Sequence, residues 1–235
     1  MASNFRRSGR SSDQPGVDRA SQQMRVLITR QAAKLIAEGL TDYHAAKLKA
    51  ARQLNCLDKN ALPDNQEIEA ALREHLHLFA ADTQPQALAA LRHVALRAMR
   101  WLQIEGQGVT GIAHGSEFAL EPWITGAVLN GTANEYSEIE LELVGVDAKT
   151  MEFILLNRGI EFDLQETNPR SKSYKPADTP KPIQYHLEFE DAPLVITLYE
   201  SHAQRQALSP RDSIKHERAK LNDAEDLFAV ENIKP

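Results

Sequence analysis

Residues 123–144 have the sequence WITGAVLNGTANEYSEIELELV, and the predicted fold class rests on the pattern in this segment. Residues 123–129 are a short apolar run that ends at Asn130-Gly131, which is typical of a buried strand entering a turn. Between residues 137 and 144, isoleucine and leucine alternate with glutamate, so a strand here has one apolar face and one acidic face. We therefore expect these two strands to lie in one sheet.

The segment after residue 144 continues the sheet pattern and adds a helix. Asp147 is a favourable N-cap for this helix, and Gly159 stands where the helix would end. Apolar patterning predicts three further strands, at residues 160–164, 185–189 and 194–199, and the last is apolar enough to be an interior strand. Residues 168–183 contain four prolines and are expected to form a long loop.

The first part of the chain has helical periodicity. Apolar residues recur at spacings of three, four and seven from Asp18 onward, which predicts four helices with short connections. The clearest start signal is Asp64 followed by Glu67, a capping box, and Thr41 or Asp42 can cap the preceding helix.

These patterns predict an α+β fold in which an N-terminal helical region precedes a mixed sheet with flanking helices. We expect a disordered tail at residues 1–17, because this segment has too few large apolar side chains to offset the entropy of ordering. The predicted units are then a helical domain at 18–105, an α/β domain at 106–204 and a basic C-terminal extension at 205–235.

Composition excludes several classes of protein. No apolar run in the 235 residues approaches the roughly 18 residues that a membrane helix needs, and the N-terminus lacks the apolar part of a secretory signal. A single cysteine, Cys56, cannot form an internal disulfide or a multi-thiolate metal site. We therefore expect a cytoplasmic protein that does not bind or span a membrane.

The charge is distributed unevenly along the chain. The net charge is −6, but residues 1–60 carry 11 Lys/Arg against 5 Asp/Glu, whereas residues 61–235 carry 16 against 28. A basic N-terminal region can bind nucleic acid or an acidic partner, and it can equally complement the acidic remainder of its own chain. The sequence leaves both alternatives open.

Two carboxylates on the alternating strand could carry chemistry. Glu138 and Glu140 are separated by one residue, so they lie on the same strand face, about 6.5–7 Å apart along the backbone. Such a pair can bind divalent metal ions, and the backbone amides of Gly131 and Thr132 in the preceding turn could hold a phosphate oxygen. Mg²⁺ bound in this way would align a hydroxyl and neutralise charge on a transferring phosphoryl group.

This segment resembles the signature of the DNA polymerase beta-like nucleotidyltransferase superfamily, which consists of a strand, a Gly-Ser turn and then an Asp-x-Asp strand. Thr132 after Gly131 takes the serine place, and Glu138 and Glu140 take the two aspartate places. The resemblance covers about residues 122–200. It implies a nucleotidyltransferase-like domain at 106–204, catalytic and Mg²⁺-binding roles for the two glutamates, and phosphoryl transfer of the nucleotidyltransferase type if the site is active.

The sequence also departs from that signature. Both aspartates are replaced by glutamates, whose extra methylene displaces the carboxylate oxygens in a site that tolerates little displacement. The superfamily adds a third carboxylate from a later strand, and the equivalent position here is Val195. The resemblance therefore implies a degenerate metal site that binds a nucleotide or nucleic acid.

The chain as a whole also resembles a small uncharacterised family of bacterial proteins, some of which are labelled UDP-N-acetylmuramate–alanine ligase. A ligase of that kind needs a GxxGK[ST] loop to bind ATP. No part of this sequence contains such a loop, so we do not adopt the label.

Two groups of basic residues provide further hypotheses. Arg205 and Arg211 begin a basic run near the C-terminus that could bind substrate phosphates, or could simply offset the carboxylates, and the run is completed by Lys215, His216, Arg218 and Lys220. The N-terminal helices carry Arg30, Lys34, Lys47, Lys49 and Arg52. The alternative function is thus a non-catalytic module that uses this basic helical arm to bind a protein or RNA, although the same cations could form a solvated helix face.

Overall fold

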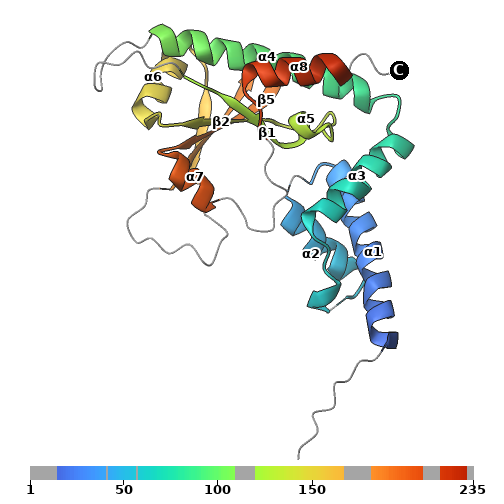
Figure 1. The fold of residues 1–235 in the computed structure, drawn as a ribbon. Helices are drawn as coiled ribbons and strands as arrows, with labels where there is room; N and C mark the ends of the chain where they lie inside the picture. The colour runs from blue at the N-terminus through green and yellow to red at the C-terminus, as the bar shows by residue number, and fades with distance from the viewer. Residues whose placement is uncertain are drawn as a thin grey trace, which may run out of the picture.

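The computed structural model describes residues 15–40, 42–56, 58–108, 120–166, 181–208 and 218–231. Within these residues the fold is α+β, as the sequence predicts, with a helical unit followed by a five-stranded mixed sheet. Figure 1 shows the two parts, with α1, α2 and α3 on one side of the molecule and the sheet with its helices on the other.

The helical unit is formed by α1 (Pro15–Ala37), α2 (Tyr43–Gln53), the 3₁₀ turn η1 (Lys59–Ala61) and α3 (Asn65–Phe79). The side chain of Asp42 caps α2, and Asp64 forms the predicted capping box with Glu67 at the start of α3. Buried small residues such as Ala46 and Ala50 let α2 pack closely on α1. Residues 15–17 belong to α1, so they are not part of a tail, and residues 1–14 of the predicted tail lie outside the described residues.

The sheet has the order β1-β2-β5-β4-β3, with β2 and β5 parallel and the other neighbouring strands antiparallel. Its strands are β1 (Trp123–Thr125), β2 (Ile139–Val144), β3 (Phe162–Glu166), β4 (Ile183–Phe189) and β5 (Ala192–Tyr199). The prediction that residues 194–199 form an interior strand is confirmed, because β5 lies between β2 and β4. Residues 168–180 of the predicted loop lie outside the described residues.

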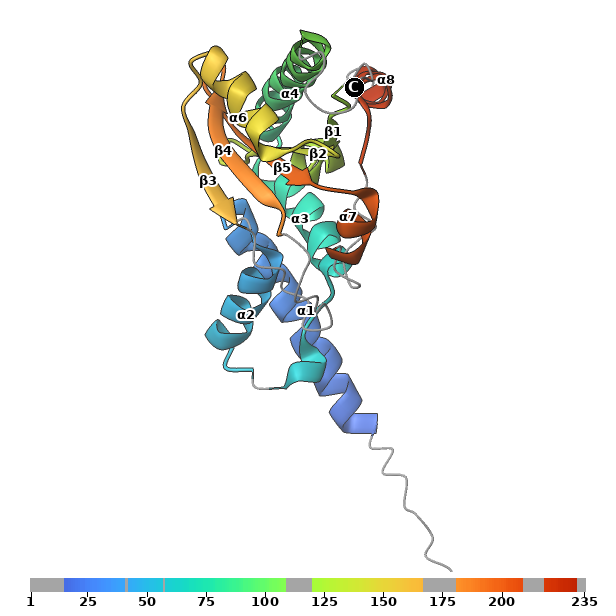
Figure 2. The same ribbon diagram turned by 90° about the vertical axis from the view of Figure 1, so that its left-hand side faces the viewer.

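The remaining helices are α4 (Gln84–Gly108), α5 (Gly126–Asn130), α6 (Ala148–Asn157), α7 (His202–Leu208) and α8 (Leu221–Glu231). The main core joins α4, α6 and α8 to the apolar face of the sheet, with Met99, Leu141 and Ile196 among its fully buried members. In Figure 1, α4 and α8 lie along one side of the sheet, and Figure 2 shows the helical unit projecting beyond the sheet.

The structure divides the chain differently from the sequence-based domains. The helix α4 packs on the sheet and not within the helical unit, because its buried stripe of Ala95, Ala98, Met99 and Leu102 faces the sheet core. At the other end of the chain, Arg205 lies in α7, and α8 buries Phe228 in the same core. The described part of the C-terminal region is therefore integral to the sheet unit and not an appended extension.

The prediction of one strand over residues 123–129 is wrong. Only residues 123–125 are a strand, and residues 126–130 form the short helix α5. Gly126 and Gly131 have positive φ angles of 73° and 78°, a backbone conformation that glycine adopts without steric cost. The two glycines thus turn the chain into and out of α5, which an apolar run alone does not indicate.

None of the helices that the structure describes is both long and apolar enough to cross a lipid bilayer.

The packing of β5 yields a prediction about stability. Ile196 is fully buried between β2 and β4, so the substitution Ile196→Ala should lower the free energy of unfolding by about 2–5 kcal/mol through lost burial and a cavity. Leu164 on the edge strand β3 is 52% exposed, and Leu164→Ala should cost less than about 1 kcal/mol. Denaturant titration of both variants measures the difference, and equal losses would contradict the assignment of β5 as the interior strand.

Candidate functional site

The candidate site lies on the face of the sheet opposite the main core. Glu140 on β2 is paired with Thr125 on β1 and with Val195 on β5, so all three side chains project from this face. Thr125 and Val195 are buried, whereas Glu140 is exposed to solvent. Val195 therefore lies directly beside Glu140.

Gly126 allows the start of α5 to approach Glu140 closely. A Cβ atom placed on Gly126 would lie 2.3 Å from Glu140 Oε1 and 2.6 Å from its carboxyl carbon, so any larger residue would displace this carboxylate. The helix is held in this position by α4, where Arg92 Nε donates to the Val128 carbonyl at 3.2 Å. Gly126 is therefore the turn residue at the carboxylate, a role that the local sequence pattern does not indicate.

The environment of Glu140 disfavours its ionised form. Burial of the carboxylate among protein atoms, together with the negative charges of Glu138 and Glu142, raises its pKa from 4.5 to about 7. The residue as a whole is nevertheless exposed to solvent, and we call the Glu140 carboxylate with Gly126 packed against it the Glu140 recess. When Glu140 is ionised, its carboxylate is repelled by Glu138 and Glu142. Binding of a proton or a cation at Glu140 would reduce this repulsion.

Glu142, which follows on the same strand, has a different environment. We expected Glu138, Glu140 and Glu142 to form a solvated acidic face, but Glu142 is buried and forms an ion pair with Arg205 of α7. Arg205 Nε lies 2.5 Å from Glu142 Oε2, and each side chain is only 12% exposed. Because α7 covers this end of the strand, the expectation of a solvated Glu142 is wrong, and Arg205 is engaged with a carboxylate.

The turn residues that we expected to bind phosphate are used within the fold. The backbone N–H groups of Gly131 and Thr132 both donate to the carbonyl of Ala127, which closes the end of α5. Gln84 Nε2 donates to the carbonyls of Gly131 and Ala133 at 3.1 and 2.9 Å and so fixes the turn from α4. These amides are therefore not available to a phosphate group in this conformation.

Among the predicted basic residues, Arg211 lies outside the described part of the chain. Arg218 is described, and its guanidinium lies over the Trp123 ring with Cζ 3.9 Å from the ring centroid. Its Nη1 atom is buried and has no hydrogen-bond partner, and burial lowers the pKa of the group. Since Trp123 is paired with Glu142, Arg218 lies over the same polar face as Glu140 and has an unsatisfied donor there.

Tyr43 brings the helical unit to this site. Burial and the charges of Glu69 and Glu140 raise the pKa of Tyr43 to about 12, and a hydrogen bond with the Thr132 side chain partly opposes them. A second contact joins the two parts, since Asn134 Nδ2 donates to the carbonyl of Ala37 at 3.0 Å. Sequence patterns could not predict the approach of Tyr43 to Glu140, because these residues are 97 positions apart.

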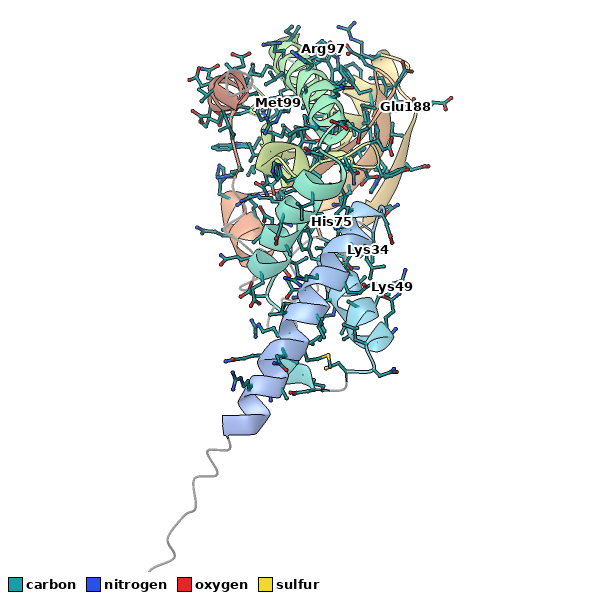
Figure 3. The ribbon with its side chains drawn as sticks, turned by 90° about the vertical axis from the view of Figure 1, so that its right-hand side faces the viewer. Lys34, Lys49, His75, Arg97, Met99 and Glu188 are labelled. Carbon is teal, nitrogen blue, oxygen red and sulfur yellow. The ribbon has the colours of Figure 1, made fainter. Side chains whose placement is uncertain are left out.

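Several cations of the N-terminal helices have structural roles. Arg25 forms a bidentate ion pair with the Glu67 carboxylate, and Lys47 Nζ donates to the carbonyl of Pro63. Lys34 Nζ lies 3.7 Å from Glu38 Oε1. Figure 3 shows Lys34 and Lys49 on the helical unit, well separated from Glu188 at the sheet. These contacts favour the interpretation of a solvated helix face that stabilises its own fold.

Glu138 and Glu140 are the candidate carboxylates for a magnesium site. Mg²⁺ is commonly bound by one or two carboxylates, with water and phosphate oxygens completing its coordination. In the described parts of the chain, no three His, Cys, Asp or Glu side chains are grouped so that they could hold a metal ion. Val195 beside Glu140 and the engagement of Glu142 with Arg205 account for the absence of a third ligand.

Comparisons with protein-family models, with curated proteins and with solved structures each find no match for this chain.

The raised pKa of Glu140 predicts a pH dependence of stability. Because the folded-state pKa exceeds the ordinary value of 4.5, the contribution of this group to stability is fully present below pH 4.5 and is lost as the pH rises to about 7. At pH 8, Glu140→Gln should therefore stabilise the protein by up to about 1 kcal/mol, a modest value because solvent screens the exposed carboxylate.

Thermal unfolding from pH 4.5 to 8 measures this effect. The matched control is Glu188→Gln, which changes an exposed carboxylate on the same sheet and should leave the pH profile of stability unchanged. If the Glu140 variant keeps the pH profile of the parent protein, Glu140 does not have the raised pKa.

The buried pair between Glu142 and Arg205 gives another prediction. Arg205→Met should destabilise the protein by about 3–5 kcal/mol, because it leaves the Glu142 carboxylate buried without its partner. Adding Glu142→Leu should recover most of this loss, since both charges are then absent. Chemical denaturation of the single and double variants tests the pairing, and additive losses would show that the two side chains do not interact.

Proposed function

We propose that the polar face around Glu140 binds a nucleotide together with one divalent cation, on a nucleotidyltransferase-like scaffold that does not catalyse transfer. The observation that carries the proposal is the Glu140 recess, in which a crowded carboxylate with a pKa of about 7 lies directly against Gly126. A bound cation would relieve the repulsion from Glu138 and Glu142 and would make the site attractive to phosphate.

The arrangement of elements supports this scaffold. A strand, a short helix beginning at a glycine, and an antiparallel strand with Glu140 follow one another in the order of the nucleotidyltransferase signature, and Glu138 lies just before that second strand. The parallel neighbour β5 is the later strand expected to carry the third carboxylate, and it has Val195 in register with Glu140. The likeness concerns the order of elements and the carboxylate positions, and the missing carboxylate argues against two-metal transfer chemistry.

Each residue has a distinct role in the proposal. Glu138 and Glu140 hold the cation, which when bound neutralises charge on the phosphate groups of the nucleotide. Arg218 donates its unsatisfied Nη1 to a phosphate oxygen, while Trp123 keeps its guanidinium plane in place. Arg205 holds Glu142 and thereby leaves Glu138 and Glu140 as the two carboxylates for the cation.

A thermal-shift screen tests the proposal with the four ribonucleoside triphosphates, each with and without Mg²⁺. At a hundredfold excess of ligand over its Kd, binding should stabilise the fold by about 2.7 kcal/mol, which corresponds to a rise in Tm of about 5–11 °C for a chain of this size. The rise should require Mg²⁺ and should be lost in the double variant Glu138→Gln, Glu140→Gln.

The matched control is Glu161→Gln, Glu188→Gln, which removes the same charge from the sheet but keeps both proposed cation ligands. This variant should retain the Mg²⁺-dependent shift. The absence of a shift at millimolar nucleotide would contradict the proposal and favour the alternative that the N-terminal helices bind a protein or RNA. A shift that survives the Glu138, Glu140 double change would show nucleotide binding elsewhere.

A further inference from the structure

A second surface of the sheet unit shares Glu138 with the proposed nucleotide site but is otherwise formed by other residues. A hollow of about 1060 Å³ lies where β4 ends and where β3 and β5 begin, beside the end of α6. Its apolar wall includes Leu156, Ile160 and Phe162, and its acidic side includes Asp163, Glu188 and Asp191. We refer to these six residues as the acidic hollow.

The apolar wall of the acidic hollow is accessible. Leu156 is 68% exposed, and Phe153, one helical turn earlier on α6, is 57% exposed. Large apolar side chains that are grouped beside a hollow and remain exposed are characteristic of a surface that binds a partner. The contact surface of the occupant must therefore include an apolar group.

The acidic side of the hollow determines the charge of its occupant. No Lys or Arg of the described residues lies within ion-pair distance of Asp163, Glu188 or Asp191. Arg97, which lies at the same β4–β5 turn, is paired with Glu190 instead. A phosphate-bearing ligand would be repelled here. An extended peptide with arginines and one apolar side chain complements both the carboxylates and the apolar wall.

The sequence contains a segment with this chemistry. Residues 1–14, MASNFRRSGRSSDQ, carry Arg6, Arg7 and Arg10 against the single acid Asp13, and they include Phe5. We propose that the acidic hollow docks residues 1–14 of a second copy of this chain, with Phe5 against the apolar wall and the arginines against the carboxylates. The copies would then associate head to tail.

The position of α1 indicates a second copy as the source of the segment. Pro15, where α1 begins, lies at the end of α1 that points away from the sheet, and α6 lies on the far side of the sheet unit (Figures 1 and 2). Fourteen residues span at most about 50 Å. Returning along the 23 residues of α1 would use about 34 Å of this length before the segment reached the sheet.

The test measures binding of a fluorescent peptide with the sequence of residues 1–14 to the full chain by anisotropy. Binding should weaken at least tenfold when the three arginines of the peptide are changed to glutamine, and again when Phe5 is changed to serine. An increase in NaCl from 50 to 500 mM should also weaken it about tenfold, because the contacts are between exposed charges.

Variants of the full chain locate the binding surface. Asp163→Lys with Glu188→Lys should weaken peptide binding at least tenfold, whereas Glu74→Lys with Asp82→Lys makes the same charge change on exposed positions elsewhere and should not. In sedimentation at low salt, deletion of residues 1–14 should abolish concentration-dependent association.

Three results would overturn the proposal. They are no peptide binding to the parent chain, equal loss of binding in both charge-reversal variants, and association that persists without residues 1–14. Each readout is independent of nucleotide and Mg²⁺, so failure of the nucleotide proposal would not affect it.

Discussion

The parallel pairing of β2 with β5 is the contact on which the rest of the structure depends. These two strands form the centre of the sheet, and their alternate residues, such as Leu141 and Ile196, are fully buried under α4 and α6. Because side chains alternate along a strand, burying this set places Glu140 and Val195 side by side on the opposite face. A shift of one residue in this register would bury glutamates in the core, so the same constraint determines both the core and the candidate site.

Three glutamates at alternate positions, one just before β2 and two within it, have three different environments. Glu138 lies at the open end of β2, Glu140 occupies a recess against Gly126, and Glu142 is buried with Arg205. The differences arise from the elements that cover each position, because α5 approaches the middle of the strand and α7 covers its end. Only Glu140 combines crowding by like charges with access to solvent, and this combination makes it the centre of the proposed nucleotide site.

The helical unit contributes to that site as well as packing on its own core. Tyr43 of α2 approaches Glu140, and Asn134 holds the carbonyl of Ala37 at the end of α1. A ligand bound at the Glu140 recess would therefore contact or displace groups that join the two parts of the molecule. The polar face is thus bordered by elements from the first third of the chain, from α5 and from α7, all positioned by the central pair of strands.

The sequence by itself determined the helix caps at Asp64 and Asp147, the apolar face of β2 and the interior position of β5, because these follow from periodicity and local hydrogen bonding over a few residues. Only the tertiary structure decided that α5 replaces a strand, that α4 belongs to the sheet core and that Glu142 is buried with Arg205. Those outcomes depend on contacts between residues tens of positions apart. The free energy of such contacts cannot be inferred from a local sequence pattern.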